Sequence, residues 1–505
     1  MKKVALILMV LTIITKIFGF LRVVVLSNYY GTSNISDVYL IATTIPTVIF
    51  AFIGISITTA YIPLYTEILN RNDEDAADNF TRNISNILFL VSAVIVFLIF
   101  LFPEPLVKVF ASGFAGETLY LAVQFTKITS ISIVFLCLTY IFKGYLHIKN
   151  NFFVPALMLI PLNSLIMVTI GLSSKYGVGI IPIGYVMAVA SQLLFVLPFV
   201  YRNGYRHSLV LQLNDSNVQK MMFLAIPVII GVSVREINVI VDRTLASQIV
   251  DGGISALTYA HKLNDFIQGI FILSISTVVY PRMSKMAAVS NIVGIRSMVK
   301  KSIIATALFV IPASVGAIIF ANPVIGLLYG RGEFDAQSMH LTSVSLVFYS
   351  IGMIGFGIRH ILSKSYYALG DTKTPMRNSA IAMVLNIILN VILSRIMGLG
   401  GLALATSISA LFCALLLTLD IQKKIGGLDL RNTAVSVGKI LVAAFFMGFV
   451  AKISFHNFTE SLGQNISLII AIATGMVLYA VTIACSKIAD VDAIIKLVKD
   501  RVAKA

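Results

Sequence analysis

Positive charge within apolar sequence is the feature of this chain that could do chemistry. Residues 14–26, ITKIFGFLRVVVL, carry Lys16 and Arg22 in a run that is long enough to cross a bilayer. A charge at the centre of a membrane helix costs at least about 2.5–3.5 kcal/mol on insertion scales, so such residues normally face a bundle interior or a water-filled cavity. Their spacing places them roughly 9 Å apart along a helix and about 120° apart around it.

Charges within the predicted spans are mostly positive, which suits an anionic ligand. Arginine is well matched to phosphate because its planar fork binds two oxygens. The alternative is that these cations pair with Asp37 or with backbone carbonyls, or extend to the membrane interface. The basic residues in the spans are Lys16, Arg22, Lys127, Arg235, Arg243, Lys262 and Arg359, and the acids are Asp37, Glu236, Asp242 and Asp265.

A second group of polar residues offers oxygen ligands. Asn386 and Asn390 are four residues apart and therefore share one helix face, and Thr406 follows in the next span. With the carboxylate of Asp242, these oxygens are of the type that hard cations prefer. Amides and hydroxyls in membrane helices also form helix–helix hydrogen bonds, so that interpretation stays open beside the cation site.

The elements that must position these residues are membrane helices. The chain has 505 residues, of which 58% are hydrophobic and only 12% charged, and its mean hydropathy is +0.95. Soluble domains carry about 25% charged residues. We therefore predict an all-α polytopic membrane protein with about 14 transmembrane helices. The predicted limits are 4–28, 37–63, 84–102, 118–142, 152–173, 178–200, 221–246, 255–280, 302–320, 341–363, 378–397, 400–421, 434–451 and 465–486.

The chain also repeats itself, which predicts two six-helix lobes in a pseudo-two-fold arrangement plus two extra C-terminal helices. ISITTAYIP (55–63) is echoed by LSISTVVYP (273–281), and Ile35-Ser36 by Ile254-Ser255. Duplicated halves are typical of transporters. The predicted domains are an N-terminal lobe over 1–215, a C-terminal lobe over 216–426, the last two spans over 427–487 and an amphipathic cytoplasmic tail over 488–505.

Charges in the loops predict the orientation of the chain. The formal net charge is +16, but Lys and Arg alternate between loops instead of forming one patch, which argues against a nucleic-acid partner. With the N-terminus inside, basic residues gather about five to one on the cytoplasmic side. Both termini are therefore expected in the cytoplasm.

Several function classes are disfavoured. The chain has no GxxxxGK[ST] motif for an ATP-driven motor. Asp73-Glu74-Asp75 resembles the Asp-x-Asp of glycosyltransferases, but its loop is too short for a nucleotide-binding domain, so we expect a transporter and not an enzyme. A multidrug antiporter would favour an acidic or aromatic cavity over this basic one.

Four segments resemble the MurJ/MviN family of lipid II flippases, which belongs to the multidrug/oligosaccharidyl-lipid/polysaccharide exporter superfamily. They are TKIFGFLRVVVLSNYYGTSNISDVYLIATTIP (15–46), KGYLHIKNNFFVPALMLIPLN (143–163), ISALTYAHKLNDFIQGIFILSISTVVYPRMSK (254–285) and SYYALGDTKTPMRNSA (365–380), the last with a D-x-K-T-P loop. The resemblance covers essentially the whole chain. It implies translocation of undecaprenyl-pyrophosphate-linked peptidoglycan precursor by alternating access.

The resemblance also implies roles for particular residues. Substrate binding falls on Lys16, Arg22, Asp37 and Lys262, and a sodium site on Asp242, Asn386, Asn390 and Thr406 with the carbonyl of Leu402. The last two spans would supply a groove for the lipid tail. Apart from Na⁺ as the coupling ion, no cofactor is expected.

The same resemblance implies the cellular setting. We expect a monomer in the bacterial cytoplasmic membrane, with the lipid-linked precursor, the bilayer and cell-wall synthesis proteins as partners. The chain departs from the family pattern in having Val23 after Arg22 and no arginine within PTVIFAFIGIS (46–56). Its cavity is therefore less cationic, which leaves export of another undecaprenyl-linked polysaccharide unit as the alternative function.

Overall fold

The computed structural model describes residues 2–486, with the side chains of all of these except 2–6, 9 and 55–58. The described residues form helices and short connections, without a strand, which confirms the all-α membrane fold. Apolar runs become helices because a helix satisfies its own backbone hydrogen bonds where lipid offers none. The predicted amphipathic tail, 488–505, lies outside the described residues.

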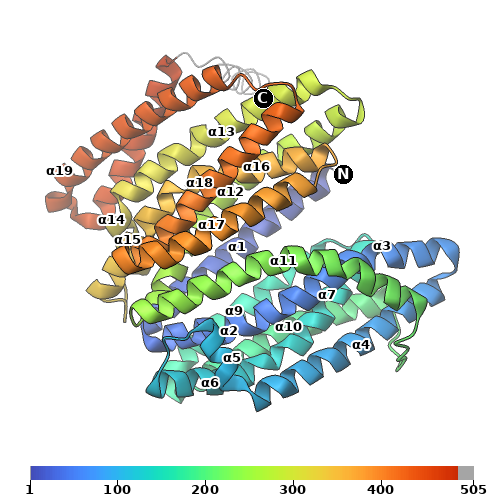
Figure 1. Ribbon diagram of the computed structural model, residues 1–505. Helices are drawn as coiled ribbons and strands as arrows, with labels where there is room; N and C mark the ends of the chain where they lie inside the picture. Colours follow the sequence, from blue (N-terminus) through green and yellow to red (C-terminus); the bar gives the residue numbers. More distant parts are fainter. Residues whose placement is uncertain (1, 487–505) are drawn as a thin grey trace. The chain divides into compact units, whose positions relative to one another are not determined.

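Packing divides the chain into two compact units (Figure 1). Unit 1 comprises Met1–Ser255 and Arg331–Asp335, and unit 2 comprises Ala256–Gly330 and Ala336–Ala505. Helix α11 (Ser216–Ile249) packs on α3 and α5 and so belongs to unit 1, although the repeat assigns it to the second lobe. The units are defined by contacts and the predicted lobes by sequence similarity, so the lobe boundaries stay a prediction.

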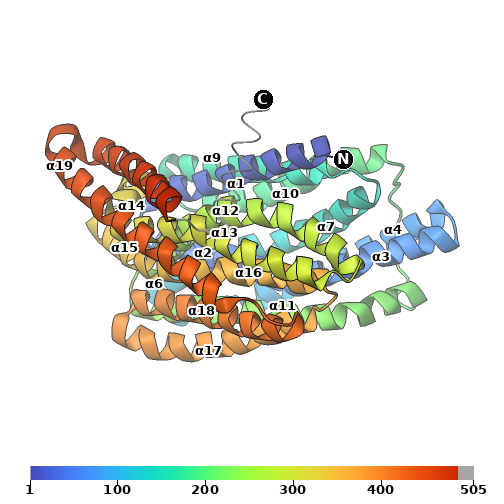
Figure 2. The same cartoon turned by 90° about the horizontal axis from the view of Figure 1, so that it is seen from above.

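Unit 1 is a bundle in which α1 packs on α9, α2 on α6, and α4 and α10 on α7. Figure 2 shows α1 beside α9 from above. A π-helix, η1, connects α2 and α3. The elements are α1 (Lys2–Tyr30), α2 (Asn34–Phe50), η1 (Ala51–Ile55), α3 (Ser56–Arg71), α4 (Glu74–Leu101), α5 (Pro103–Phe110), α6 (Gly116–Ser130), α7 (Ser132–Ile148), α8 (Phe153–Leu157), α9 (Leu159–Tyr176), α10 (Ile180–Arg202) and α11.

Unit 2 is built around α18, which packs on α15, α16 and α17, while α13 packs on α16 and α19. Both Figure 1 and Figure 2 show α17 and α18 running side by side. The elements are α12 (Gly253–Ala288), whose first turn lies in unit 1, α13 (Ile292–Ile319), α14 (Ala321–Tyr329), α15 (Ala336–Ile351), α16 (Met353–Ala368), α17 (Lys373–Met397), α18 (Leu399–Lys424) and α19 (Leu430–Cys485).

The described residues contain 12 helices that are long and apolar enough to span a membrane, or up to 13 if one bent pair counts as a span. That pair is α15 and α16, which meet at 46°. Helix α19 is 56 residues long and breaks at Gly463, where φ is 76°. Only glycine adopts such an angle readily. The break falls between the two last predicted spans, and the total of 14 stays a prediction.

The bend between α15 and α16 depends on close backbone packing. Gly352 lies at the bend, and a Cβ atom there would be 2.5 Å from the Cα atom of Ser407 on α18. The hydroxyl of Ser407 donates to the carbonyl of Phe348, 2.6 Å away, and so fixes α18 to the last turn of α15. Glycine at position 352 therefore allows the backbone at the α15–α16 bend to approach the backbone of α18 closely.

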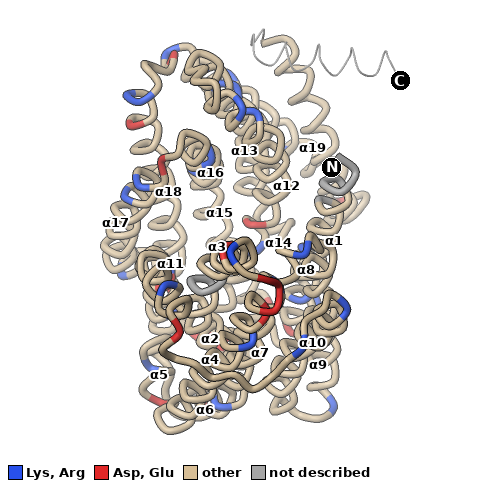
Figure 3. Tube along the Cα trace, turned by 90° about the vertical axis from the view of Figure 1, so that its right-hand side faces the viewer, with Lys and Arg blue, Asp and Glu red and all other residues tan. Residues whose placement is uncertain are grey.

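Large apolar side chains face outward as well as inward. Phe97 on α4 and Phe449 on α19 are each 63% exposed. Figure 3 shows long stretches of helix without charge, with Lys, Arg, Asp and Glu sparse along them. Such surfaces are expected where helices contact lipid and not water.

Candidate functional site

Helix α1 carries both predicted substrate cations of unit 1. Lys16 is exposed and Arg22 is half-buried. Arg22 lies within electrostatic range of the phenol groups of Tyr39 on α2 and Tyr185 on α10, both of which are buried. No ion pair joins either cation to a carboxylate in the described part of the chain. These positive charges are therefore available to an external anion.

Asp37 has a different environment from the one the sequence indicated. Its carboxylate is 1% exposed and accepts hydrogen bonds from the backbone N–H groups of Ser255 at 2.7 Å and Ile254 at 3.3 Å. These are the first turn of α12, whose N–H groups have no partner within the helix. Asp37 therefore caps a helix N-terminus. A substrate role for Asp37 stays a prediction. The capping contacts are sufficient to explain why this carboxylate is buried.

The charges of α11 support the same turn. The guanidinium of Arg243 donates to the carbonyl of Ile254 at 3.1 Å and acts electrostatically on Asp37. Asp242, the predicted cation ligand, is half-buried and accepts from the amide of Asn238 at 3.2 Å. Arg243 thus contributes to the structure of the α11–α12 turn.

Lys262 lies on α12 in unit 2 and is half-buried. Its neighbour His261 contacts Asp265 with 3.1 Å between the ring Nδ1 and a carboxylate oxygen, one turn further along the helix. The imidazole also packs edge-on against Tyr349 of α15, with 5.3 Å between ring centroids. The carboxylate of Asp265 thus pairs with His261.

Four of the five cation-site candidates lie on α17 and α18, two helices that pack against each other. The amide of Asn390 donates to the side-chain oxygen of Asn386 at 3.1 Å, and both residues are buried. The hydroxyl of Thr406 donates to the carbonyl of Leu402 at 3.0 Å. The Asn386 amide nitrogen has no hydrogen-bond partner among the residues that the structure describes. Asp242, the fifth candidate, belongs to unit 1.

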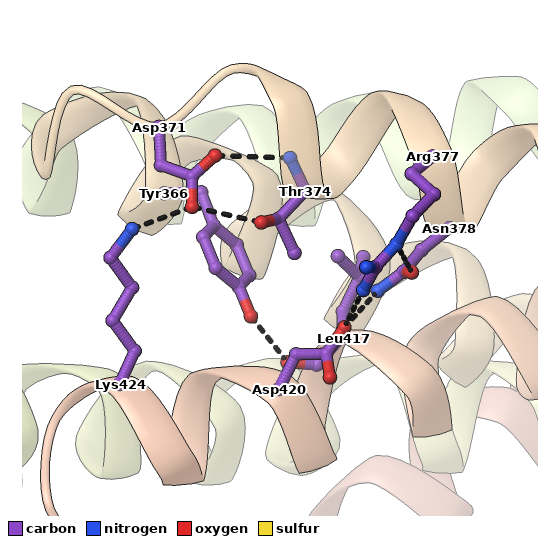
Figure 4. Close-up of polar contacts among 8 residues, drawn as sticks. All are labelled: Tyr366, Asp371, Thr374, Arg377, Asn378, Leu417, Asp420 and Lys424. Atoms are coloured by element: carbon purple, nitrogen blue, oxygen red, sulfur yellow. Dashed lines mark hydrogen bonds and ion pairs between the residues drawn. The ribbon is translucent and has the colours of Figure 1, made fainter.

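Sequence reasoning missed a cluster of polar contacts around the D-x-K-T-P loop, shown in Figure 4 and called here the loop clasp. Asp371 accepts from the backbone and hydroxyl of Thr374, at 3.0 and 2.9 Å, and pairs with Lys424 at 2.5 Å. The hydrogen bond from Lys424 and that from the Thr374 backbone lower the pKa of Asp371 to about 2. The loop is therefore fastened to the end of α18.

A second ion pair completes the loop clasp. Asp420 on α18 accepts from Arg377 and from the amide of Asn378, each at 2.9 Å. Between the two pairs, the phenol of Tyr366 donates to the carbonyl of Leu417 at 3.2 Å. The contact between Asp371 and Thr374 had a signal in the sequence, because an aspartate three residues before a threonine is a spacing that favours capping of a helix start. Nothing local indicated the partners on α18.

Comparison with known proteins identifies the relatives of this chain. A family model described as Lipid II flippase MurJ matches residues 26–473. The probable lipid II flippase MurJ of Vibrio cholerae is 30% identical over 422 residues, covering 81% of this chain and 80% of the relative. The lipid II flippase MurJ of Thermosipho africanus is 30% identical over 412 residues, covering 81% and 84%.

Solved structures give the same result. A structure described as lipid II flippase MurJ in an inward closed conformation matches with a TM-score of 0.84 and 28% identity, over 97% of this chain and all of that one. An inward-facing MATE family multidrug transporter of the MOP superfamily matches with a TM-score of 0.66 and 14% identity, over 82% and 94%. The second likeness shows a shared fold alone.

Proposed function

Because this chain belongs to the MurJ family of lipid II flippases, we propose that it moves lipid II from the inner to the outer leaflet of the bacterial cytoplasmic membrane. The family match over residues 26–473 carries the proposal. The MOP-type fold supports alternating access as the mode of movement.

In this proposal the cations of α1 hold the pyrophosphate. Arg22 is the first choice because its guanidinium is half-buried, and a fork of donors suits two phosphate oxygens. Lys16 adds a second positive charge on the same helix, and Lys262 a third on α12. Asp37 would act on this group indirectly, through the turn that it caps.

The driving force has two proposed sources. The substrate is anionic, and each charge that crosses the membrane potential is worth about 2.3 kcal/mol per 100 mV, directed outward when the interior is negative. Na⁺ is the second source, at Asp242, Asn386, Asn390, Leu402 and Thr406. The amide oxygen of Asn386, the hydroxyl of Thr406 and the carbonyl of Leu402 are ligands of the type that a hard cation takes, which supports this source.

The orientation of the chain is also a proposal. We place both termini in the cytoplasm and the lipid tail along α19. A cysteine at Ser290 should then resist an impermeant thiol reagent added to intact cells, whereas one at Lys175 should react, in a Cys485→Ser background. The opposite pattern would invert the topology. We further propose that the protein acts as a monomer beside cell-wall synthesis proteins.

Complementation tests the proposed function. The chain is expressed in a bacterium depleted of its own lipid II flippase, and lipid II exposed on the outer leaflet is measured, with membrane insertion quantified in parallel. Restored exposure is the expected result. Stable insertion without restoration would contradict the proposal and favour another undecaprenyl-linked glycan, which the same cells can be tested for. A strain with the empty vector is the control.

A further inference from the structure

The connection between α10 and α11 is bound to the surface of unit 1 by side chains of α4. We call residues 203–215 the α10–α11 strap; it contains neither helix nor strand. Asn83 forms two hydrogen bonds with Gln212, donating to its carbonyl at 2.9 Å and accepting from its N–H at 2.8 Å. Asn86 donates to the carbonyls of Ser208 and Val210, each at 2.9 Å.

The ends of the α10–α11 strap are fixed as well. Tyr205 is fully buried and packs against Phe142, with 5.4 Å between ring centroids. At the other end, Asp215 accepts from the N–H groups of Asn217 and Val218 and so begins α11. Arg82 adds a hydrogen bond from its Nε to the carbonyl of Arg206. The strap is therefore held in a defined conformation by contacts along its length.

Three leucines of the α10–α11 strap face away from the protein. Leu209 is 93% exposed, Leu211 53% and Leu213 58%, whereas Val210 between the first two is half-buried. Isolated exposed leucines are ordinary, but three within five residues concentrate apolar surface in one short segment, called here the leucine row. Water would be a poor environment for these leucines. Side chains of α4 bond the backbone of Ser208, Val210 and Gln212, which lie next to them in sequence.

The face of α4 that binds the strap also indicates what lies beside it. Asn83 and Asn86 share a helix face with Leu90, Val94 and Phe97, because these positions follow at helical spacing. Those three side chains are 47%, 52% and 63% exposed on a helix that qualifies as a membrane span. The strap thus lies at the end of a lipid-facing surface, where the bilayer meets water.

Charge around the leucines fits the same environment. Arg202 and Arg206 are exposed at the start of the strap, whereas Lys220, one turn into α11, pairs with Glu67 at 2.7 Å. Residues 203–214 contain no acidic side chain. Apolar residues flanked by cations are typical of segments that lie in the interface, with the cations near lipid phosphates.

We propose that the α10–α11 strap is a membrane-surface anchor in which Leu209, Leu211 and Leu213 enter the boundary between headgroups and acyl chains. Arg202 and Arg206 then contact phosphates of the same leaflet. Asn83 and Asn86 support this insertion, because they give partners to backbone groups of Ser208, Val210 and Gln212 where the strap approaches hydrocarbon. Unit 1 is thereby fixed in depth at the point where the chain leaves α10 and enters α11.

Site-directed spin labelling tests the anchor in the purified full chain. Exposed Cys485 is first replaced by serine, and a nitroxide is placed at Leu211→Cys or, as the control, at Ser290→Cys in the exposed α12–α13 connection. The protein is studied in vesicles of phosphatidylethanolamine and phosphatidylglycerol. We expect the label at 211 to gain collisions with oxygen and lose collisions with a water-soluble nickel complex, relative to the label at 290.

The role of the asparagines has its own measurement. Asn86→Ala should release the strap, so the label at 211 becomes more mobile and more accessible to nickel. Asn214→Ala is the matched control because Asn214 is exposed in the same segment and makes none of these contacts with α4. Equal mobility in the two variants would remove Asn86 from the anchor.

Two outcomes would overturn the proposal as a whole. In the first, the label at 211 is as accessible to nickel as the label at 290, which would mean that the leucines lie in water. In the second, residue 211 is protected from thiol reagents in cell membranes but not in the purified vesicles. That result would assign the leucine row to a protein partner instead of lipid. Neither depends on whether the chain flips lipid II.

Discussion

Two arginines, Arg22 of unit 1 and Arg377 of unit 2, have opposite surroundings. Arg22 is half-buried in a membrane helix and has no carboxylate partner among the described residues. Arg377 is 64% exposed beside a loop and pairs with Asp420 at 2.9 Å. The charge of Arg22, which is costly to bury, is left without a carboxylate partner among the described residues. The charge of Arg377, which is exposed at little cost, is neutralised by Asp420. The difference motivates the proposed ligand role of Arg22, whereas the ion pair of Arg377 contributes to the fold.

The largest expected effect separates these two arginines. Arg22→Ala should lower lipid II exposure in the complementation assay by about tenfold to a hundredfold, the equivalent of about 1.5–3 kcal/mol for a lost charge-assisted hydrogen bond. Arg22→Lys should keep part of the activity, because it retains the charge without the fork. Arg377→Ala is the control and should stay near the unchanged chain. Full activity of well-inserted Arg22→Ala would exclude it from binding.

A smaller effect is expected where unit 2 is tightly packed. Gly352→Ala places a Cβ atom 2.5 Å from the Cα of Ser407, so α16 and α18 must separate. Overpacking of this kind costs about 1–3 kcal/mol, which thermal unfolding in detergent would record as a lower Tm. Gly316→Ala on α13 is the matched control, since nothing lies within 4 Å of its added Cβ. Equal Tm values would show that the bend tolerates a side chain.

The loop clasp should contribute less, and in a pH-dependent way. Asp371→Asn is expected to reduce the free energy of unfolding by about 0.5–2 kcal/mol at pH 7, as for other capping residues. The pKa of Asp371 is about 2 in the folded protein and 3.8 ordinarily. Its stabilisation is therefore complete above pH 3.8 and disappears as the pH falls towards 2. The Tm difference between variant and native chain should shrink over that range; a constant difference would contradict the ion-pair account.

The smallest effect is expected for the other half of that pair. Lys424→Met keeps the apolar length of the side chain and removes the charge, and Lys424 is 40% exposed. Exposed ion pairs contribute about 0.2–1 kcal/mol. The Tm should fall by less than for Asp371→Asn, because the contact of Asp371 with Thr374 remains. A larger fall would mean that Lys424 supports more of the loop than this pair.

Local patterns were sufficient for the helices and for the contacts within them. Hydropathy located the spans, since long apolar segments have few alternatives to helix in a membrane. The four-residue spacing of Asn386 and Asn390 correctly placed both on one face, and they bond to each other. The division of α19 was visible too, because Gly463 lies between two apolar runs.

Contacts between distant segments were not predictable in this way. The sequence identified Asp37 as a charge within a span and offered Lys16 or Arg22 as its partner, but its partners are the N–H groups of residues 254 and 255. Backbone groups are nearly the same in every residue, so composition and spacing do not indicate which of them will bind a given side chain. The ion pair of Asp371 with Lys424 likewise joins residues 53 apart, and many lysines at that end of the chain were equally eligible.

The cap at Asp37 also sets an order of events during synthesis. Its partner Ile254 is 217 residues further along the chain. Ribosomes add about 5–20 residues per second, so roughly ten to forty seconds pass between the translation of the carboxylate and that of its partner. Throughout this interval, an acid destined for a dry interior is without the N–H groups that will receive it. Until α12 has been synthesised, the side chain of Asp37 must therefore either remain in contact with water or carry a proton.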